Sequence, residues 1–141
     1  MLKRKEGVNM ELKFSLESTK KILEAFYSET TDFKGKVTSK VEKGSVGYYE
    51  EMGAIVSIKL KGKIKVLDEE VELEKNITPD EVTEAFKHVL AKNNMEVEEV
   101  HYESGLRNRS VGYGMSESIE HIPYFNGVRV RIKNNTKLKT I

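Results

Sequence analysis

An unbroken two-residue alternation over residues 54–66 limits how this chain folds more than any other feature. Apolar side chains occupy one phase of the alternation, and lysine fills most of the other. The apolar phase comprises Val56, Ile58, Leu60, Ile64 and Val66, and the polar phase comprises Ser57, Lys59, Lys61, Lys63 and Lys65. Because side chains along a β-strand point alternately to opposite faces, this pattern predicts either one long strand or a hairpin that turns at Lys61-Gly62.

The same alternation returns near the end of the chain, over residues 127–133. Its inward phase is Val128, Val130 and Ile132, and its outward phase is Arg129, Arg131 and Lys133. Shorter stretches with strand character cover residues 11–15, 36–42, 70–75 and 95–103. In the last of these the apolar phase shifts between Val97 and Val100, which predicts a β-bulge.

Two helices are expected between these strands. Thr78, Pro79 and Glu81 supply an N-cap hydroxyl, a proline at the first helical position and a carboxylate at the third. One helix therefore begins at residue 79; its inward face is Val82, Ala85, Phe86, Val89 and Leu90, and Asn93-Asn94 is a plausible stop. An earlier helix over about residues 18–28 has Ser15 or Ser18 as its cap, with Ile22, Leu23, Ala25 and Phe26 inward.

The two halves of the sequence share several features in the same order. Glu24-Ala25-Phe26 recurs as Glu84-Ala85-Phe86, and Ser45-Val46-Gly47-Tyr48 recurs as Ser110-Val111-Gly112-Tyr113. In both halves a valine, Val37 or Val97, follows the phenylalanine by eleven residues, and Gly53 or Gly127 precedes a basic strand. The shared order predicts an internal duplication of a β-α-β-β(-β) unit.

These elements predict one α+β domain over residues 1–141, with two helices packed on a twisted, mainly antiparallel sheet. Residues 1–9 are expected to be a flexible extension, 10–67 the first half-repeat, 68–135 the second, and 136–141 a tail. The element order resembles the paired βαβββ modules of the vicinal oxygen chelate family, and Ala25-Phe26-Tyr27 is similar to a motif common there. The resemblance implies a divalent-metal enzyme, but the expected first strands, near Lys13 and Glu72, offer no histidine ligand.

Composition excludes several classes of protein. The chain has no cysteine, which excludes disulfides, thiolate nucleophiles and cysteine-based metal sites. No signal peptide or membrane-spanning run is apparent, so a cytoplasmic protein is expected. The net charge of +1 argues against a dedicated DNA-binding protein, although residues 105–141 carry seven basic and two acidic groups, a local charge of +5. The lysine-rich composition is typical of AT-rich genomes such as those of low-GC bacteria and their phages.

Catalytic motifs are missing from the sequence. There is no Gly-x-Ser-x-Gly elbow, and the loops around Gly44-Ser45-Val46-Gly47 and Gly112-Tyr113-Gly114 match neither the Walker A nor the dinucleotide fingerprint. A metal site would need convergence of His101, Glu103, Glu120 and His121, whereas ordinary surface positions explain these residues more simply. No catalytic residue, metal or cofactor is assigned, and an enzyme is less expected than a binding protein.

The most informative chemical feature is where the arginines fall. Lysine outnumbers arginine 19 to 5, yet four of the five arginines lie after residue 104. Guanidinium groups grip phosphate or carboxylate with two parallel hydrogen bonds and stack on aromatic rings. The predicted anion site comprises Arg107, Asn108, Arg109, Tyr113, His121, Tyr124, Asn126, Arg129 and Arg131, with Tyr48 and Tyr49 from the related half. The alternative is that Arg129 and Arg131 cover a sheet face and pair with Glu72, Glu74, Glu96 and Glu98.

Three hypotheses of function follow. The first is a non-enzymatic protein that binds or sequesters a small phosphorylated or nucleotide-like ligand. Its cleft would be lined by a 105–114 loop, the 121–126 segment and strand 127–133. A phage or mobile element is one candidate origin. The second is a nucleic-acid-binding or protein-inhibitor module that uses Lys59, Lys61, Lys63 and Lys65 together with Arg129, Arg131 and Lys133. Such a lysine ladder alone is more often a solvated face or a protected edge than a binding surface. The third is the metal-dependent enzyme. Exposed strand edges also favour a homodimer.

Overall fold

A computed structural model describes residues 10–46, 51–112 and 118–133. Within them the chain is built from two helices and six strands. In chain order these are β1 (Met10–Ser15), α1 (Leu16–Thr30), β2 (Lys34–Val46), β3 (Glu51–Val66), β4 (Glu69–Ile77), α2 (Pro79–Ala91), β5 (Val97–Val111) and β6 (Ser118–Ile132). The α+β class is confirmed. The alternating segment 54–66 forms one long strand, because the chain turns at Leu67-Asp68 and not at Gly62.

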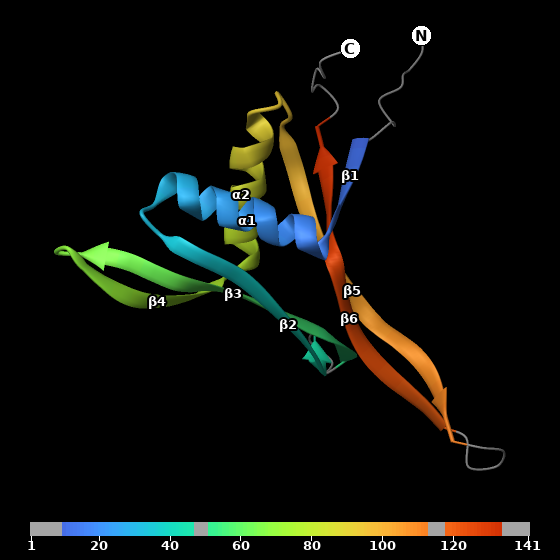
Figure 1. The fold of residues 1–141 in the computed structure, drawn as a ribbon. Coiled ribbons are helices and arrows are strands. Elements are labelled where there is room, and N and C mark those ends of the chain that lie inside the picture. The colour runs from blue at the N-terminus through green and yellow to red at the C-terminus, as the bar shows by residue number, and fades with distance from the viewer. Residues whose placement is uncertain (1–9, 47–50, 113–117, 134–141) are drawn as a thin grey trace, which may run out of the picture.

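The strands form two antiparallel three-stranded sheets in place of the single sheet that we predicted. One sheet has the order β1-β6-β5 and the other β2-β3-β4. Each sheet joins the long hairpin of one half of the chain to the first strand of the other half (Figure 1). Sequence patterns give the inward phase of a strand but not its partner, so this exchange of first strands could not be predicted.

Each half of the chain has the order β-α-β-β, with no fifth element in the described residues. The described parts of the repeated sequence words fall within the helices and at the ends of β2 and β5. Their burial differs, however: Phe86 is fully buried whereas Phe26 is only partly buried, and Ala85 is buried whereas Ala25 is exposed. A common origin of the two halves therefore stays a prediction.

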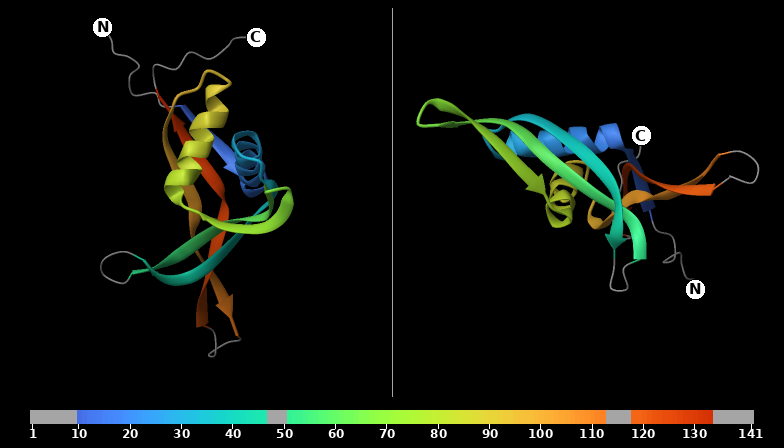
Figure 2. Two further views of the ribbon diagram at one scale, coloured as in Figure 1. Left: turned by 90° about the vertical axis from the view of Figure 1, so that its left-hand side faces the viewer. Right: turned by 90° about the horizontal axis from the view of Figure 1, so that it is seen from below.

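One hydrophobic core holds the two sheets together. Both helices pack in the angle between the sheets (Figures 1 and 2). The largest fully buried side chains are Phe86, Leu23, Leu60, Ile132, Val82, Val128 and Val130. The ring of Phe14 in β1 lies 5.2 Å from that of Phe86 in α2, centroid to centroid. Burial beside Phe125 raises the pKa of Tyr102 to about 12, because the low-dielectric core disfavours the phenolate.

The helix starts confirm the capping signals of the sequence. Ser15 caps α1 by accepting a hydrogen bond from the backbone N–H of Ser18, which decides between the two predicted caps. Thr78 and Glu81 form a reciprocal capping box at the start of α2. Such a box satisfies two backbone donors that would otherwise be unpaired. Among the described helices, neither has the length and apolar content needed to cross a membrane.

A long two-stranded arm extends from the β1-β6-β5 sheet. β1 stops at Ser15 opposite Gly127, so β5 and β6 continue without it, and residues 104–111 pair only with 118–125 (Figure 1). We call these two segments the arm. The prediction of a 105–114 loop is wrong as far as residue 111, because residues 105–111 pair one by one with residues 118–124 of β6. The predicted bulge is confirmed by register shifts at Val97/Glu99 and Tyr102/Ser104.

Candidate functional site

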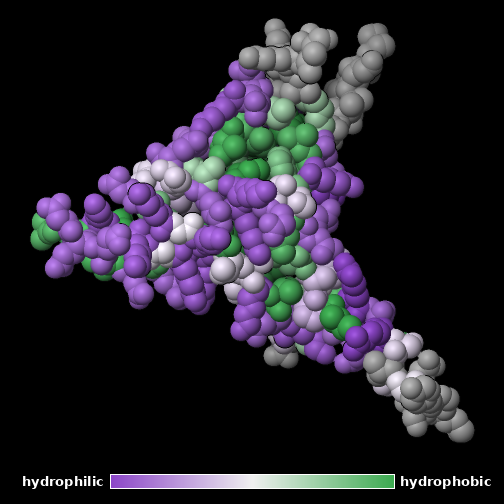
Figure 3. Space-filling model, in the orientation of Figure 1, coloured by the Kyte–Doolittle hydropathy of each residue, from purple (hydrophilic) through white to green (hydrophobic). Residues whose placement is uncertain are grey.

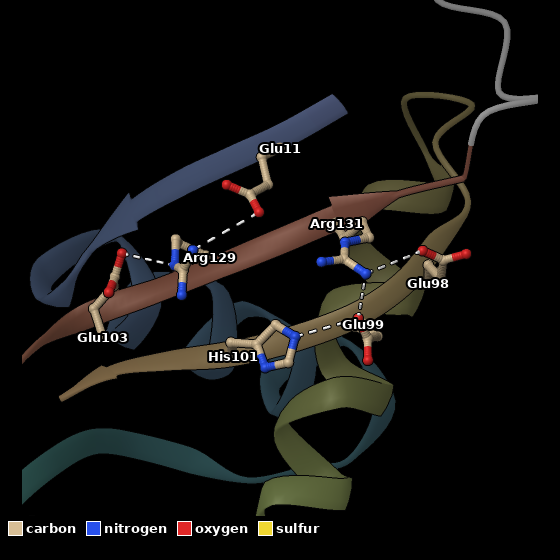
Figure 4. Close-up of polar contacts among 7 residues, drawn as sticks. All are labelled: Glu11, Glu98, Glu99, His101, Glu103, Arg129 and Arg131. Carbon is tan, nitrogen blue, oxygen red and sulfur yellow. Dashed lines mark hydrogen bonds and ion pairs between the residues drawn. The ribbon is translucent and has the colours of Figure 1, made fainter. Parts of the chain in front are cut away.

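The arginines of β6 lie on the outer face of the β1-β6-β5 sheet and are neutralised there. Nε of Arg129 is 2.9 Å from a carboxylate oxygen of Glu103, and Nη1 is 3.8 Å from one of Glu11. Nη1 of Arg131 is 2.9 Å from Glu99 and 3.9 Å from Glu98 (Figure 4). The Nε atoms of both arginines are buried and have no hydrogen-bond partner among the described residues. The contact between Nε of Arg129 and Glu103 is therefore an ion pair without hydrogen-bond geometry. The sheet-face alternative describes this pair better than an anion site does, but of its four predicted partners only Glu98 is found. Glu72 and Glu74 lie on the other sheet, and Glu96 pairs with Lys133.

The two arginines of the arm, Arg107 and Arg109, also contact other side chains of the arm. Nη2 of Arg109 donates a hydrogen bond of 2.7 Å to Glu120, which lies directly opposite in the arm. The guanidinium carbon of Arg107 lies 4.7 Å from the centroid of the Tyr124 ring, a cation–π contact. Tyr124 in turn packs over Gly105, where an added Cβ would lie 3.1 Å from its hydroxyl.

The remaining predicted anion-site residues do not complete a common pocket with the arginines. Asn108 and His121 face each other across the arm, with 2.7 Å between Oδ1 and Nδ1. Tyr124 and Asn126 border a shallow hollow of about 390 Å³ that has no arginine in its described lining. Tyr48, Tyr49 and Tyr113 lie outside the described residues. Of the four predicted arginines, only Arg107, which stacks on Tyr124, has no carboxylate partner in the described part of the chain.

A metal centre built from His101, Glu103, Glu120 and His121 is not formed. Nε2 of His101 is 3.3 Å from Glu99, Glu103 pairs with Arg129, and Glu120 pairs with Arg109. In the parts of the chain that the structure describes, no three acidic or histidine side chains gather closely enough to hold an ion. The resemblance to the vicinal oxygen chelate family thus lacks its ligand set here.

The second basic surface is the outer face of the β2-β3-β4 sheet, which points away from the helices. Its lysines alternate with the core residues of β2 and β3, as the register of the sheet requires. We call this surface the lysine face; its lysines are Lys34, Lys36, Lys40, Lys59, Lys61, Lys63 and Lys65. Four glutamates share the face, namely Glu42, Glu70, Glu72 and Glu74. Seven positive against four negative charges leave an excess of three positive charges.

Like charges lie directly opposite each other on the lysine face. Lys34 is opposite Lys63, and Lys36 is opposite Lys61, in the β2-β3 register. Like charges at directly opposed positions destabilise a sheet, whereas opposite charges there stabilise it. On the β4 side the lysines of β3 face glutamates, since Lys61, Lys63 and Lys65 lie opposite Glu74, Glu72 and Glu70. The other sheet also has one like-charged opposition, Lys13 with Arg129, but carboxylates lie at ion-pair distance from the arginine there. Lys34 and Lys36 at the edge of the lysine face have only lysines opposite them.

Most lysines of this face have no anionic partner among the described residues. Glu74 serves both Lys59, at 3.3 Å, and Lys61, at 3.5 Å. The hydrogen bond from Lys59, followed by the charges of both lysines, holds the pKa of Glu74 below its ordinary value. Within the described ranges, no carboxylate lies at ion-pair distance from the other central lysines, Lys34, Lys36, Lys63 and Lys65.

The lysine face is shallow and polar. A hollow of about 360 Å³ on it is bordered by residues of β2 and β3, among them Lys40, Lys59 and Lys61. Thr38 and Ser57 add hydroxyl groups to the same hollow. Where β2, β3 and β4 are described, the face holds no aromatic side chain. It can therefore bind anions through charge and hydrogen bonds, but it offers no ring for base stacking.

Sequence reasoning found only part of this surface. The ladder from Lys59 to Lys65 was visible, but Lys34, Lys36 and Lys40 were not connected with it. The available signal was that Lys36 and Lys40 share one phase of the predicted strand 36–42, whereas Lys34 lies just before that range. The missing information was the register, which places these lysines against those of β3.

The comparisons with known proteins add no assignment. No family model, curated protein or solved structure matches this chain. The functional argument therefore depends on the geometry of the described residues.

Proposed function

We propose that this protein is a non-catalytic nucleic-acid-binding module that contacts the phosphate backbone through the lysine face. The observation that carries the proposal is the pair of like-charged oppositions, Lys34 with Lys63 and Lys36 with Lys61, which a bound polyanion would turn from a cost into an attraction. The absence of cysteine fits a cytoplasmic location for such a protein.

An extended polyanion fits this surface better than a small ligand. Residues 59–65 of β3 span roughly 20 Å at the usual rise of a strand. The lysines are distributed over that length and do not converge on the hollow of the face, which Lys34, Lys36, Lys63 and Lys65 do not line. A small phosphorylated ligand would need an enclosed site with convergent donors. The regular phosphates of a nucleic acid can instead meet several lysines at once, with no reading of base sequence.

Salt dependence tests this function directly. We expect a fluorescently labelled 20-base-pair duplex of arbitrary sequence to raise its anisotropy on binding at 50 mM NaCl. If the four unpaired lysines each neutralise a phosphate, the logarithm of the affinity falls with the logarithm of salt with a slope of about −3.6. The affinity then drops roughly 100-fold between 50 and 200 mM salt. Absence of binding at 50 mM, or an affinity insensitive to salt, would contradict the proposal.

A further inference from the structure

The arm extends beyond the body of the fold with both of its strand edges open. Within the described residues no third strand pairs with it, and its outer end projects away from the rest of the molecule (Figures 1 and 2). In the outer half, residues 107–110 of β5 and 118–121 of β6 are all exposed. Hydrophilic side chains cover most of this outer half on the side that Figure 3 shows. A two-stranded ribbon is at best marginally stable in water, so the arm would gain from a further strand.

The β6 edge of the arm lacks a donor near its middle, whereas the β5 edge is complete. Pro123 of β6 lies opposite Leu106 of β5. Because proline has no N–H, it fits a strand where its nitrogen faces away from the neighbouring strand, and Pro123 therefore interrupts the outer edge of β6. Opposite residues in an antiparallel ladder alternate between bonded and non-bonded pairs. The outward backbone groups of β5 in the arm thus belong to Ser104, Leu106, Asn108 and Ser110.

We propose that two copies of this chain associate through the β5 edges of their arms, about a two-fold axis at Leu106. The edges run antiparallel, so residues 103–109 of one copy lie opposite residues 109–103 of the other. The outward groups of Leu106 meet those of its copy, and those of Ser104 meet those of Asn108. The two arms then form one four-stranded antiparallel sheet. The contact is isologous, so it closes at a dimer.

Charge favours this register over those centred nearer the tip of the arm. It places Arg109 of each copy opposite Glu103 of the other. A register centred on Arg107 would oppose two copies of that arginine, and one centred on Asn108 would oppose Arg107 to Arg109. Like charges directly opposite each other destabilise a sheet. Both acidic and basic groups of the contact already have partners, since Glu103 lies 2.9 Å from Arg129 and Arg109 lies 2.7 Å from Glu120. The contact therefore joins two ion pairs whose charges sum to zero.

Arg107, which has no carboxylate partner in the described residues, meets an aromatic ring of the other copy in this register. It lies opposite Gly105 of that copy, and the ring of Tyr124 packs over Gly105. The two Arg107 side chains are diagonal neighbours, and each is held 4.7 Å from the ring centroid of its own Tyr124. The lysine face belongs to the other sheet and takes no part, so phosphate binding and dimer formation use different surfaces.

Light scattering after gel filtration tests the dimer without any nucleic acid. We expect the wild-type chain to elute as a dimer at 50 µM. Leu106→Lys places two like charges opposite each other at the two-fold axis and should raise the dissociation constant at least tenfold. The control is Ile119→Lys, which adds the same charge on the β6 side of the arm, at a side chain that is 62% exposed, and should leave the dimer intact. A monomeric wild-type chain, or equal effects of the two substitutions, would overturn the proposal.

Cross-linking tests the register, and the natural absence of cysteine makes it clean. Leu106→Cys places a thiol opposite its copy, at a Cα separation of about 5.5 Å that a disulfide can bridge. The thiols of Asn108→Cys lie on the same face but four residues apart along the sheet, roughly 14 Å, which is too far. Under mild oxidation the Leu106→Cys chain should form a disulfide dimer at least tenfold faster, although Asn108 is the more exposed residue. Equal rates, or faster reaction of Asn108→Cys, would exclude this register. Because neither experiment contains nucleic acid, their failure leaves the proposed function to its own test.

Discussion

The double variant Lys36→Glu/Lys63→Glu is expected to bind duplex DNA at least 100-fold more weakly than the wild-type chain at 50 mM salt. It removes two phosphate contacts and places two carboxylates against the backbone. The salt slope should also fall in magnitude by about 2, which is roughly 0.9 for each lost contact. Anisotropy titrations over a series of salt concentrations measure both quantities.

Stability separates this effect from damage to the fold. In the variant the carboxylate at position 36 lies opposite Lys61, and the carboxylate at position 63 lies between Lys34 of β2 and Glu72 of β4. The two new opposite-charge pairs and the one new like-charge pair largely offset each other, so the free energy of unfolding should stay within about 1 kcal/mol of the wild-type value. The matched control is Lys13→Glu/Lys87→Glu, which changes the net charge equally outside the lysine face and should bind within threefold of wild type. Equal losses in the two double variants would show that net charge alone governs binding.

The substitution Gly127→Ala is expected to destabilise the fold by about 3 kcal/mol or more. Gly127 has a φ angle of 126° and lies opposite Ser15, where β1 passes into α1. A Cβ atom there would lie 1.9 Å from the carbonyl oxygen of Phe14 and 2.9 Å from the backbone nitrogen of Leu16. Backbone atoms cannot move aside as a flexible side chain can, so β1 must separate from β6.

Urea unfolding followed by circular dichroism measures this loss. The control is Gly105→Ala in the arm, where the nearest atoms to an added Cβ belong to the side chain of Tyr124 at 3.1 Å or more. That change should cost about 1 kcal/mol or less, because the ring can shift. If Gly127→Ala unfolds at the wild-type urea midpoint, the backbone conformation described for the β1-α1 junction is wrong.

Local signals in the sequence predicted the elements well. Thr78 fixed the start of α2, and the start of α1 was narrowed to a cap at Ser15 or Ser18. Strict alternation gave the inward phases of β6 and of β3, except for Val66, which is exposed. These features depend on neighbours within a few residues, so the sequence contains all the information they need. The same holds for the bulge in β5, which the shift of the apolar phase between Val97 and Val100 predicted.

Long-range pairing was beyond sequence reasoning, and it changed the functional interpretation. The arginine pattern of β6 predicts a ligand site, but β1 and β5 bring Glu11, Glu99 and Glu103 beside those arginines. The lysine pattern of β3 alone is typical of a solvated face, but β2 brings further lysines opposite it on one side while β4 brings glutamates on the other. In both cases the deciding charges come from residues distant in sequence, and only the strand register shows whether they neutralise or reinforce each other.

Mapping the bound surface by nuclear magnetic resonance tests the central claim most directly. Unlabelled duplex DNA is titrated into the ¹⁵N-labelled chain at low salt, and backbone amide shifts are followed residue by residue. The account predicts that the largest shifts fall within residues 34–42 of β2 and 57–65 of β3, with little change at Arg129 and Arg131. Shifts centred on β6 and the arm, or no shifts at all, would contradict it.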